Sequence, residues 1–143
     1  MKISTRGRYA LRVMIDLAEH YSGNYIRLKD IVERQEISQK YLEGIMTDLS
    51  KAGLVEGQHG KGGGYKLNRA PADYSVGEIL RITEGDLAPI ACLEQDAAYC
   101  ARAQECRTLP MWRKLYKLIN DFFDGVSLAD LMREGDAGDD YVI

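Results

Sequence analysis

Apolar residues recur at helical spacing in three segments near the start of the chain. These segments are residues 8–21, 28–35 and 39–52. Ser38 is placed to cap the third segment, and Gly53 follows it as glycine often follows the end of a helix. Two helices joined by a short turn, the second well capped, are typical of a helix-turn-helix.

A glycine-rich stretch then separates two short apolar runs. Residues 54–56 and 65–67 have the pattern of short strands, and residues 57–64 include five glycines. This arrangement predicts a β-hairpin wing whose tip needs positive φ angles. A nucleotide-binding phosphate loop is the competing interpretation. It fails because no Lys-Ser or Lys-Thr pair follows and no strand-to-helix turn surrounds the glycines.

The second half of the chain predicts three more helices. A capping box at Ser75 opens a helix at about 76–84, a helix follows Pro110 over 110–124, and a second capping box at Ser127 opens a short last helix. The helix at 110–124 carries a wide apolar stripe of Trp112, Leu115, Leu118, Ile119, Phe122 and Phe123. We expect part of this stripe to pack against a second subunit, with ordinary intrachain packing as the alternative.

These elements predict a mainly α fold with a small β-hairpin wing. Residues 1–70 are expected to form a winged helix-turn-helix DNA-binding domain. Residues 71–133 are expected to hold a sensor loop (85–109) and a dimerisation helix (110–124). The remaining residues, 134–143, are acidic and are expected to be a disordered tail.

Composition limits the classes of protein to consider. The chain has 143 residues, of which 45% are apolar and 29% charged, as is ordinary for a soluble domain. No run approaches the roughly 18 apolar residues of a membrane span, and the start lacks the apolar stretch of a secretory signal. We therefore expect a cytoplasmic protein with no membrane partner. In that compartment, clustered cysteines more often bind metal or sense redox state than form structural disulfides.

The charge is unevenly distributed along the chain. The net charge is −3, yet residues 1–70 carry 12 Lys and Arg against 8 Asp and Glu. Residues 71–143 carry 7 against 14. A locally basic half suits contact with nucleic acid phosphates. The alternative is that this is merely uneven surface charge.

The predicted winged helix offers nine candidate DNA contacts. At the start of the third helix, Gln39 and Lys40 can donate to bases or phosphates beside Ser38, and Glu43 can accept from a cytosine amino group. A solvated helix face is the alternative for Glu43, whereas Tyr41 is expected in the core. His59 on the wing suits a narrow minor groove. The expected phosphate contacts are Arg6, Arg8, Lys51 and Lys61.

Three cysteines form the other candidate site. Cys92, Cys100 and Cys106 are the only cysteines, and seven and five residues separate them. Three thiolates suit an iron–sulfur cluster, and the absence of a close Cys-x2–4-Cys pair makes zinc a poorer match. A thiol redox switch needs only two of them, with Arg102 and Arg107 placed to lower thiol pKa values. Small thiols filling a loop core, with no sensing role, are the third interpretation.

Four stretches of the sequence carry a resemblance to a known family. They are residues 1–12, 37–43, 51–55 and 60–67, and their order, spacing and positions all fit. Over about residues 1–133 the chain resembles the bacterial Rrf-two-type regulators, which include the iron–sulfur cluster regulator and the nitric-oxide-sensing repressor. The resemblance implies a homodimeric winged-helix transcription factor that binds a double-stranded DNA operator. The recognition helix would enter the major groove and the wing the adjacent minor groove.

The resemblance also implies a cofactor. In cluster-binding relatives, three cysteines matching Cys92, Cys100 and Cys106 ligate a 2Fe-2S or 4Fe-4S cluster that sets DNA affinity. The first gap here is longer than the five residues of the best-known members. Some relatives take the fourth ligand from a histidine, where this chain has Leu109, or from an acidic residue, where it has Arg8. The fourth ligand here is then an exogenous thiol, or absent, or one of Glu105, Thr108 and Glu94.

Two other function classes are weaker. An enzyme would need a nucleophile–base–acid group, and none is evident because both histidines are remote in sequence from the cysteines. A protein-binding module does not need a glycine-rich wing beside basic residues. The sequence therefore predicts a transcriptional regulator whose operator affinity is controlled by an iron–sulfur cluster. A cluster-free thiol switch of the same family is the alternative.

Overall fold

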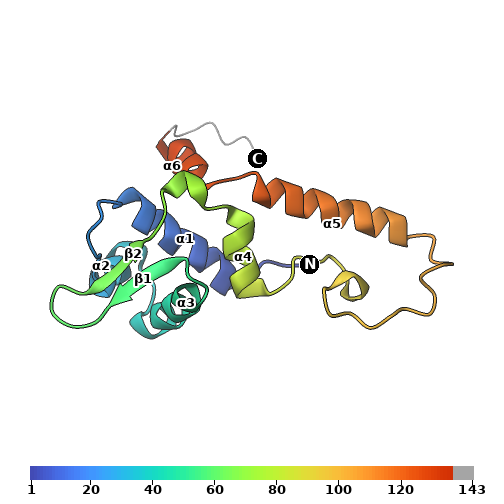
Figure 1. Ribbon diagram of the computed structural model, residues 1–143, viewed down its shortest axis with the longest axis horizontal. Helices are drawn as coiled ribbons and strands as arrows, with labels where there is room; N and C mark the ends of the chain where they lie inside the picture. Colours follow the sequence, from blue (N-terminus) through green and yellow to red (C-terminus); the bar gives the residue numbers. More distant parts are fainter. Residues whose placement is uncertain (137–143) are drawn as a thin grey trace.

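The structure is a computed structural model that describes residues 1–136, and it is mainly helical (Figure 1). Its elements, in chain order, are α1 (Thr5–Glu19), α2 (Leu28–Gln35), α3 (Gln39–Lys51), β1 (Val55–Gln58), β2 (Gly64–Leu67), the 3-10 turn η1 (Pro71–Asp73), α4 (Val76–Glu84), the 3-10 turn η2 (Ala91–Leu93), α5 (Leu109–Asp124) and α6 (Leu128–Asp136). The predicted mainly α fold with a β-hairpin wing is confirmed. No helix in the described range is long and apolar enough to cross a membrane.

Serine side chains cap the start of four helices, including Ser127, which accepts from the backbone N–H of Asp130 at 3.0 Å before α6. Ser4 accepts from the backbone N–H of Gly7 at 3.1 Å, and Ser38 from that of Tyr41 at 3.3 Å. Ser75 caps α4 in the same way. At the other end of α3, Gly53 has a φ of +77°, as expected of a glycine that follows a helix. These local contacts explain why the sequence pattern located α3 and α4 closely, whereas α1 begins at Thr5, three residues before the predicted start.

One main core joins the first three helices to the wing and to α6. Its buried side chains include Leu17 of α1, Ile31 of α2, Ile45 of α3 and Leu128 of α6. The winged helix is therefore completed by residues beyond the predicted boundary at residue 70. Asp16, also buried, accepts from Arg34 at 2.8 and 3.0 Å and so joins α1 to α2.

The wing is a two-stranded antiparallel hairpin, with Val55 opposite Leu67. It is joined to the segment before α2 because Ile26 and Tyr65 exchange two backbone hydrogen bonds of 2.8 Å. Gly64 lies so close to this bridge that a Cβ atom there would come within 2.1 Å of the Ile26 carbonyl oxygen. The glycine at this position is therefore required by close backbone approach.

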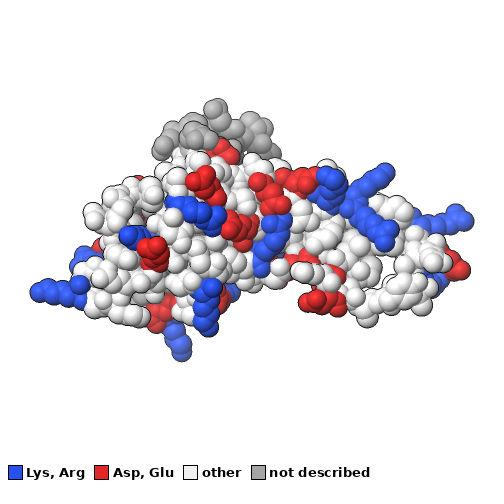
Figure 2. Space-filling model, in the orientation of Figure 1, with Lys and Arg blue, Asp and Glu red and all other residues white. Residues whose placement is uncertain are grey.

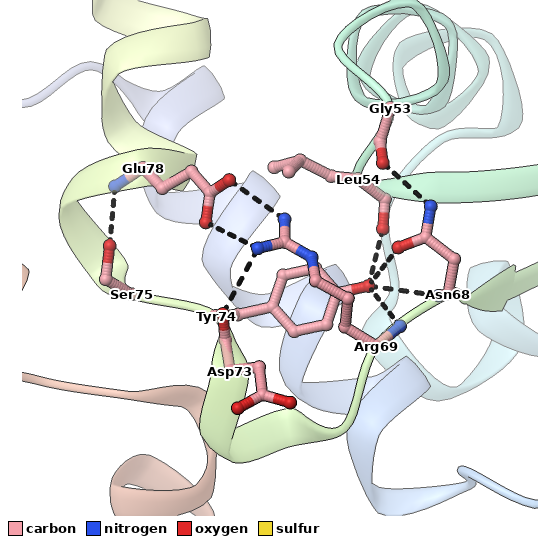
Figure 3. A network of polar contacts seen from close by, with 8 residues as sticks. All are labelled: Gly53, Leu54, Asn68, Arg69, Asp73, Tyr74, Ser75 and Glu78. Carbon is pink, nitrogen blue, oxygen red and sulfur yellow. Dashed lines mark hydrogen bonds and ion pairs between the residues drawn. The ribbon is translucent and has the colours of Figure 1, made fainter.

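A polar network fastens the base of the wing to the start of α4 (Figure 3). The buried Tyr74 hydroxyl donates to the carbonyl oxygen of Leu54 at 2.7 Å and accepts from the backbone N–H of Asn68 at 3.0 Å. Arg69 stacks over the Tyr74 ring and forms an ion pair with Glu78 at 2.8 Å. The wing is thus fixed at its base while its glycine-rich tip is exposed.

A second, smaller cluster holds α5 against α4. Val76, Leu80 and Leu87 are buried there, with Ile119 and Phe123 packed on them. Arg81 adds hydrogen bonds to both carboxylate oxygens of Asp124, at 2.7 and 3.0 Å. From this attachment, α5 runs out beyond the winged helix, next to the loop that precedes it (Figure 1).

The predicted apolar stripe of α5 is divided between two faces. Ile119 and Phe123 pack within the chain, as the intrachain alternative requires. An adjacent face presents large exposed apolar residues, with Leu118 and Phe122 each 66% exposed, together with Met111 and Leu115. This second set is free for another subunit, while Trp112 belongs to neither set and is half-buried.

Three expectations need correction. The first helix ends at Glu19, so Tyr21 lies beyond it and is exposed. Tyr41, expected in the core, is 37% exposed and packs edge-on against the Tyr9 ring at 5.6 Å between ring centroids. The expected disordered tail began at residue 134, but α6 continues to Asp136. Residues 137–143 of that predicted tail lie outside the described residues.

Candidate DNA interface and cysteine pocket

Helix α3 separates a buried face from an exposed one. Leu42, Ile45, Met46 and Leu49 are buried in the core. The candidate base contacts Ser38, Gln39, Lys40 and Glu43 are all exposed at the start of the helix. The Gln39 amide donates to the Glu43 carboxylate at 3.1 Å, so the two side chains lie together on one surface. The structure therefore brings together the polar groups that the sequence singled out for base contact.

Two arginines at the start of α1 have different surroundings. Arg8 is exposed, and its guanidinium donates to the Thr5 hydroxyl at 3.2 Å. Arg6 donates to the Gly44 carbonyl oxygen at 3.0 Å and forms an ion pair with Asp48. Both partners of Arg6 belong to α3. Arg6, expected to contact phosphate, is thus already bonded to the predicted recognition helix.

The remaining candidates surround a groove between α3 and the wing. Lys51 and His59 line this cavity of about 530 Å³, together with Thr47 and the glycines of the wing. Lys61 is exposed at the wing tip, where Gly60 and Gly62 have φ angles of +88° and +78°. Figure 2 shows basic side chains projecting at the wing end of the molecule and along the edge beneath α3, where acidic side chains also lie, and basic and acidic side chains side by side near α4. The projecting basic side chains suit phosphate contact.

One exposed residue of this surface was missed in the sequence. Thr47 lies one turn after Glu43, is exposed, and donates from its hydroxyl to the Glu43 carbonyl oxygen at 2.8 Å. Its position four residues after Glu43 was the available signal, because such residues share one helix face.

The three cysteines line one cavity in the loop between α4 and α5. All three are free and exposed, and the cavity measures about 240 Å³. Its other lining residues are mostly apolar, with Arg113 of α5 as the charged member. Among the side chains that the structure describes, no three His, Cys, Asp or Glu are grouped closely enough to hold a metal ion. The donor chemistry fits three-thiolate ligation, but the loop would have to close for the thiolates to meet.

The candidate fourth ligands lie at different distances from this cavity. The Thr108 hydroxyl is 3.5 Å from the Cys106 sulfur. Glu105 is exposed within the loop, and Glu94 lines a separate cavity beside Asp86. Leu109, which stands where some relatives have histidine, is buried. Of the three candidates, Thr108 is the one in contact with a cysteine.

The local environment activates one thiol. The Thr108 hydroxyl and then its backbone N–H lower the pKa of the Cys106 thiol below its ordinary value, and Arg102 contributes in the same direction. The predicted effect of Arg102 is therefore present, although Thr108 is the larger cause. A lower thiol pKa means more thiolate at a given pH, and the thiolate is both the nucleophile and the metal ligand.

Asp86 holds the base of the cysteine-bearing loop. Its carboxylate accepts from the backbone N–H groups of Ala88 at 2.8 Å and Gln95 at 2.7 Å, and from the Tyr116 hydroxyl of α5 at 2.7 Å. Burial raises the pKa of Asp86, but these hydrogen bonds outweigh it and leave the pKa below its ordinary value. The same carboxylate raises the pKa of Tyr116. Neither Asp86 nor Tyr116 was identified from the sequence.

The sequence and the structure were compared with those of known proteins. The sequence model of the Rrf2 family, described as an iron-dependent transcriptional regulator, matches residues 3–134. The chain is 39% identical over 132 residues to the HTH-type transcriptional regulator IscR of Aliivibrio salmonicida. The aligned region covers 92% of this chain and 77% of the relative.

Two solved structures share the fold. CymR, the global cysteine regulator of B. subtilis, superposes with a TM-score of 0.75 at 32% identity, over 94% of this chain and 98% of that one. IscR of T. potens superposes with a TM-score of 0.73 at 34% identity, over 100% of this chain and 94% of that one.

Proposed function

The chain belongs to the Rrf2 family of DNA-binding transcriptional regulators, and we propose that the state of Cys92, Cys100 and Cys106 sets its affinity for operator DNA. The observation that carries the proposal is the shared cavity. Three free cysteines from 15 residues of loop line one small space, attached to a winged helix through α4 and α5. Such a site joins metal-binding or redox chemistry to a DNA-reading surface.

The leading occupant is an iron–sulfur cluster on the three cysteines. Such a group, when bound, supplies a centre that responds to oxidants and to iron supply. The chain supplies three thiolates, a Thr108 hydroxyl beside Cys106, and the positive charge of Arg113 at the wall of the cavity. A cation near several thiolates lowers the cost of bringing their negative charges together. The names of the IscR relatives support this choice.

A thiol switch without a cluster is the second candidate. The specific observation in its favour is the exposed Cys106 thiol with its lowered pKa, near two other free cysteines. Thiolate attack followed by capture by a second cysteine would join two parts of the loop as a disulfide, with an external oxidant accepting the two electrons.

The two candidates are separated by purifying the protein without oxygen. The cluster predicts a visible absorption band with matching iron and sulfide counts, and Cys→Ala at 92, 100 or 106 should remove it. Gln104→Ala, an exposed position in the same loop, is the matched control and should keep the band. If reconstituted protein takes up no iron or sulfide while oxidation alone changes operator affinity, the thiol switch replaces the cluster. If neither treatment changes affinity, the cysteine site has no regulatory role.

We also propose that the exposed face of α5 forms a homodimer. Leu115, Leu118 and Phe122 form an apolar strip on this face. A two-fold interface needs a self-complementary patch, and a helix packed against its own copy provides one. Phe122→Glu should give a folded monomer in sedimentation, whereas Lys117→Ala on the polar side should stay dimeric. A dimeric Phe122→Glu protein would place the interface elsewhere.

A further inference from the structure

The last residue of α4 is bonded to the start of α1. One carboxylate oxygen of Glu84 accepts from the backbone N–H of Ser4 at 2.9 Å and from its hydroxyl at 2.7 Å. The same Ser4 oxygen caps α1 by accepting from Gly7. The fit is close, because a Cβ atom added to Gly7 would come within 2.2 Å of the Glu84 carboxylate. The position of Glu84 therefore fixes the position of the first turn of α1.

The first turn of α1 is bonded in turn to α3. Arg6, two residues after Ser4, donates to the Gly44 carbonyl oxygen and forms an ion pair with Asp48. These contacts lie midway along the helix that presents the candidate base contacts. A shift of the first turn of α1 would therefore move this attachment of the recognition helix.

On its other side, Glu84 is close to the anchor of the cysteine-bearing loop. Gly85 alone separates it from Asp86, and Gly85 has a φ of +79°. Asp86 accepts from the backbone N–H of Gln95, which lies three residues after Cys92 in the chain. The cysteines line one cavity without converging, and Cys92 lies between the two backbone groups that Asp86 bonds, so drawing Cys92 toward the others would pull on this segment.

We propose that residues 84–86 are the joint through which the state of the cysteine-bearing loop reaches the recognition helix, with Asp86 and Glu84 as its two positioning residues. The proposal rests on the proposed function, since it assumes that the cysteines regulate DNA affinity. Both ends of this three-residue segment are bonded to other elements, so a displacement of Asp86 is passed to Glu84. The alternative route is the direct packing of α4 on α1 and α5, which needs neither carboxylate.

The test removes each carboxylate and measures coupling rather than affinity alone. The variants are Asp86→Ala and Glu84→Ala, with Asp73→Ala as the control because it removes the same charge from an exposed site. Operator affinity is measured for each protein with its cysteines reduced and metal-free, loaded with iron and sulfide, and oxidised. The probe is the duplex that the wild-type protein selects from genomic fragments. A merely structural defect would weaken binding in all states alike and leave their ratio unchanged.

The joint predicts a specific pattern of ratios. In wild type and in Asp73→Ala, operator affinity should differ between the cysteine states by at least about fivefold. In Glu84→Ala the ratio should fall below about twofold, although iron and sulfide uptake stays normal. Glu84→Gln keeps an acceptor oxygen for Ser4 and should restore the ratio. In Asp86→Ala, the ratio of operator affinities between states should also fall. The protein loaded with iron and sulfide should lose them faster than wild type does. A Glu84→Ala protein with the wild-type ratio would overturn the joint.

A second readout does not depend on the cysteine chemistry. In the reduced, metal-free protein, Asp86→Ala should speed amide hydrogen exchange at residues 92–106 and also at residues 5–8. Faster exchange confined to the loop would overturn the joint. If wild-type operator affinity is the same in every state, the proposed regulation by the cysteines is wrong. The exchange pattern then still tests whether residues 84–86 link the loop to α1. If Glu84→Ala does not fold, Ser4→Ala removes the hydroxyl from the same contact and takes its place.

Discussion

The winged helix and the cysteine-bearing loop fix their functional side chains in different ways. In α3, the exposed polar residues stand on a helix whose opposite face, including Leu42 and Ile45, is completely buried. In the loop, the cysteines are all exposed, and the carboxylate of Asp86 supplies bonds at its base. The proposed DNA-reading surface is therefore formed in advance, whereas the proposed cysteine site would be shaped by what binds there. Regions that respond to a ligand need this lower local stability.

The largest expected contrast is in stability. Leu17→Ala opens a cavity in the main core and should lower the free energy of unfolding by about 2–5 kcal/mol. Tyr99→Ala removes a larger side chain from the loop, but Tyr99 is 80% exposed, so the change should stay within about 0.5 kcal/mol. Urea denaturation of both variants measures the contrast. A comparable loss for Tyr99→Ala would mean that the loop is packed as the core is.

The next largest loss of stability is expected at the base of the wing. Tyr74→Phe keeps the buried ring but removes the hydroxyl, leaving the Leu54 carbonyl oxygen without its donor, and should cost about 1–3 kcal/mol. The matched control is Tyr21→Phe, which alters an exposed hydroxyl and should change stability little. Equal denaturation midpoints for the two variants would show that the network of Figure 3 does not stabilise the wing.

Two lysines test whether the preformed surface binds phosphates. Lys40→Ala combined with Lys61→Ala should weaken binding to all duplex sequences and lower the salt slope by about one for each phosphate contact removed. Binding is measured by titration at several salt concentrations. Lys114→Ala combined with Lys117→Ala on α5 removes the same charge from exposed positions and should leave the slope unchanged. A slope unaffected by the double substitution would place the phosphate contacts elsewhere.

The smallest expected effect concerns a single thiol in the loop. Thr108→Val removes the hydroxyl that lowers the pKa of Cys106, so the pKa should rise toward its ordinary value. Alkylation of reduced, metal-free protein over a range of pH, with each cysteine read separately, should show the Cys106 midpoint moving upward. Thr47→Val, far along the chain on α3, should leave it in place. A midpoint that moves downward would contradict the assigned cause.

Local signals in the sequence predicted most of the fold. Helix α2 has the predicted bounds. Helix α3 differs by one residue at its end, because Ser38 and Gly53 mark its boundaries through local backbone geometry. The wing followed from glycines that must adopt positive φ. The candidate base contacts and the three cysteines were also identified, because each set lies within one short segment.

Contacts between distant parts of the chain could not be predicted. Asp86 and Tyr116 are thirty residues apart, and no repeat or spacing connects them. Arg6 looked like a free phosphate ligand because its partners on α3 are brought near only by the fold. The stripe on α5 showed which residues are apolar but not which face meets α4, so Ile119 could not be told from Phe122.

The division of α3 into two faces bears on how operator preference can change during evolution. Ser38 caps the helix, but Gln39, Lys40, Glu43 and Thr47 are exposed and contribute little to the core. Surface substitutions of this kind usually change stability by no more than about 0.5 kcal/mol. Under the proposed role of this face in DNA binding, duplicated copies of such a gene would acquire new DNA targets by changing these four positions, while the folded scaffold and the cysteine-bearing loop are inherited intact.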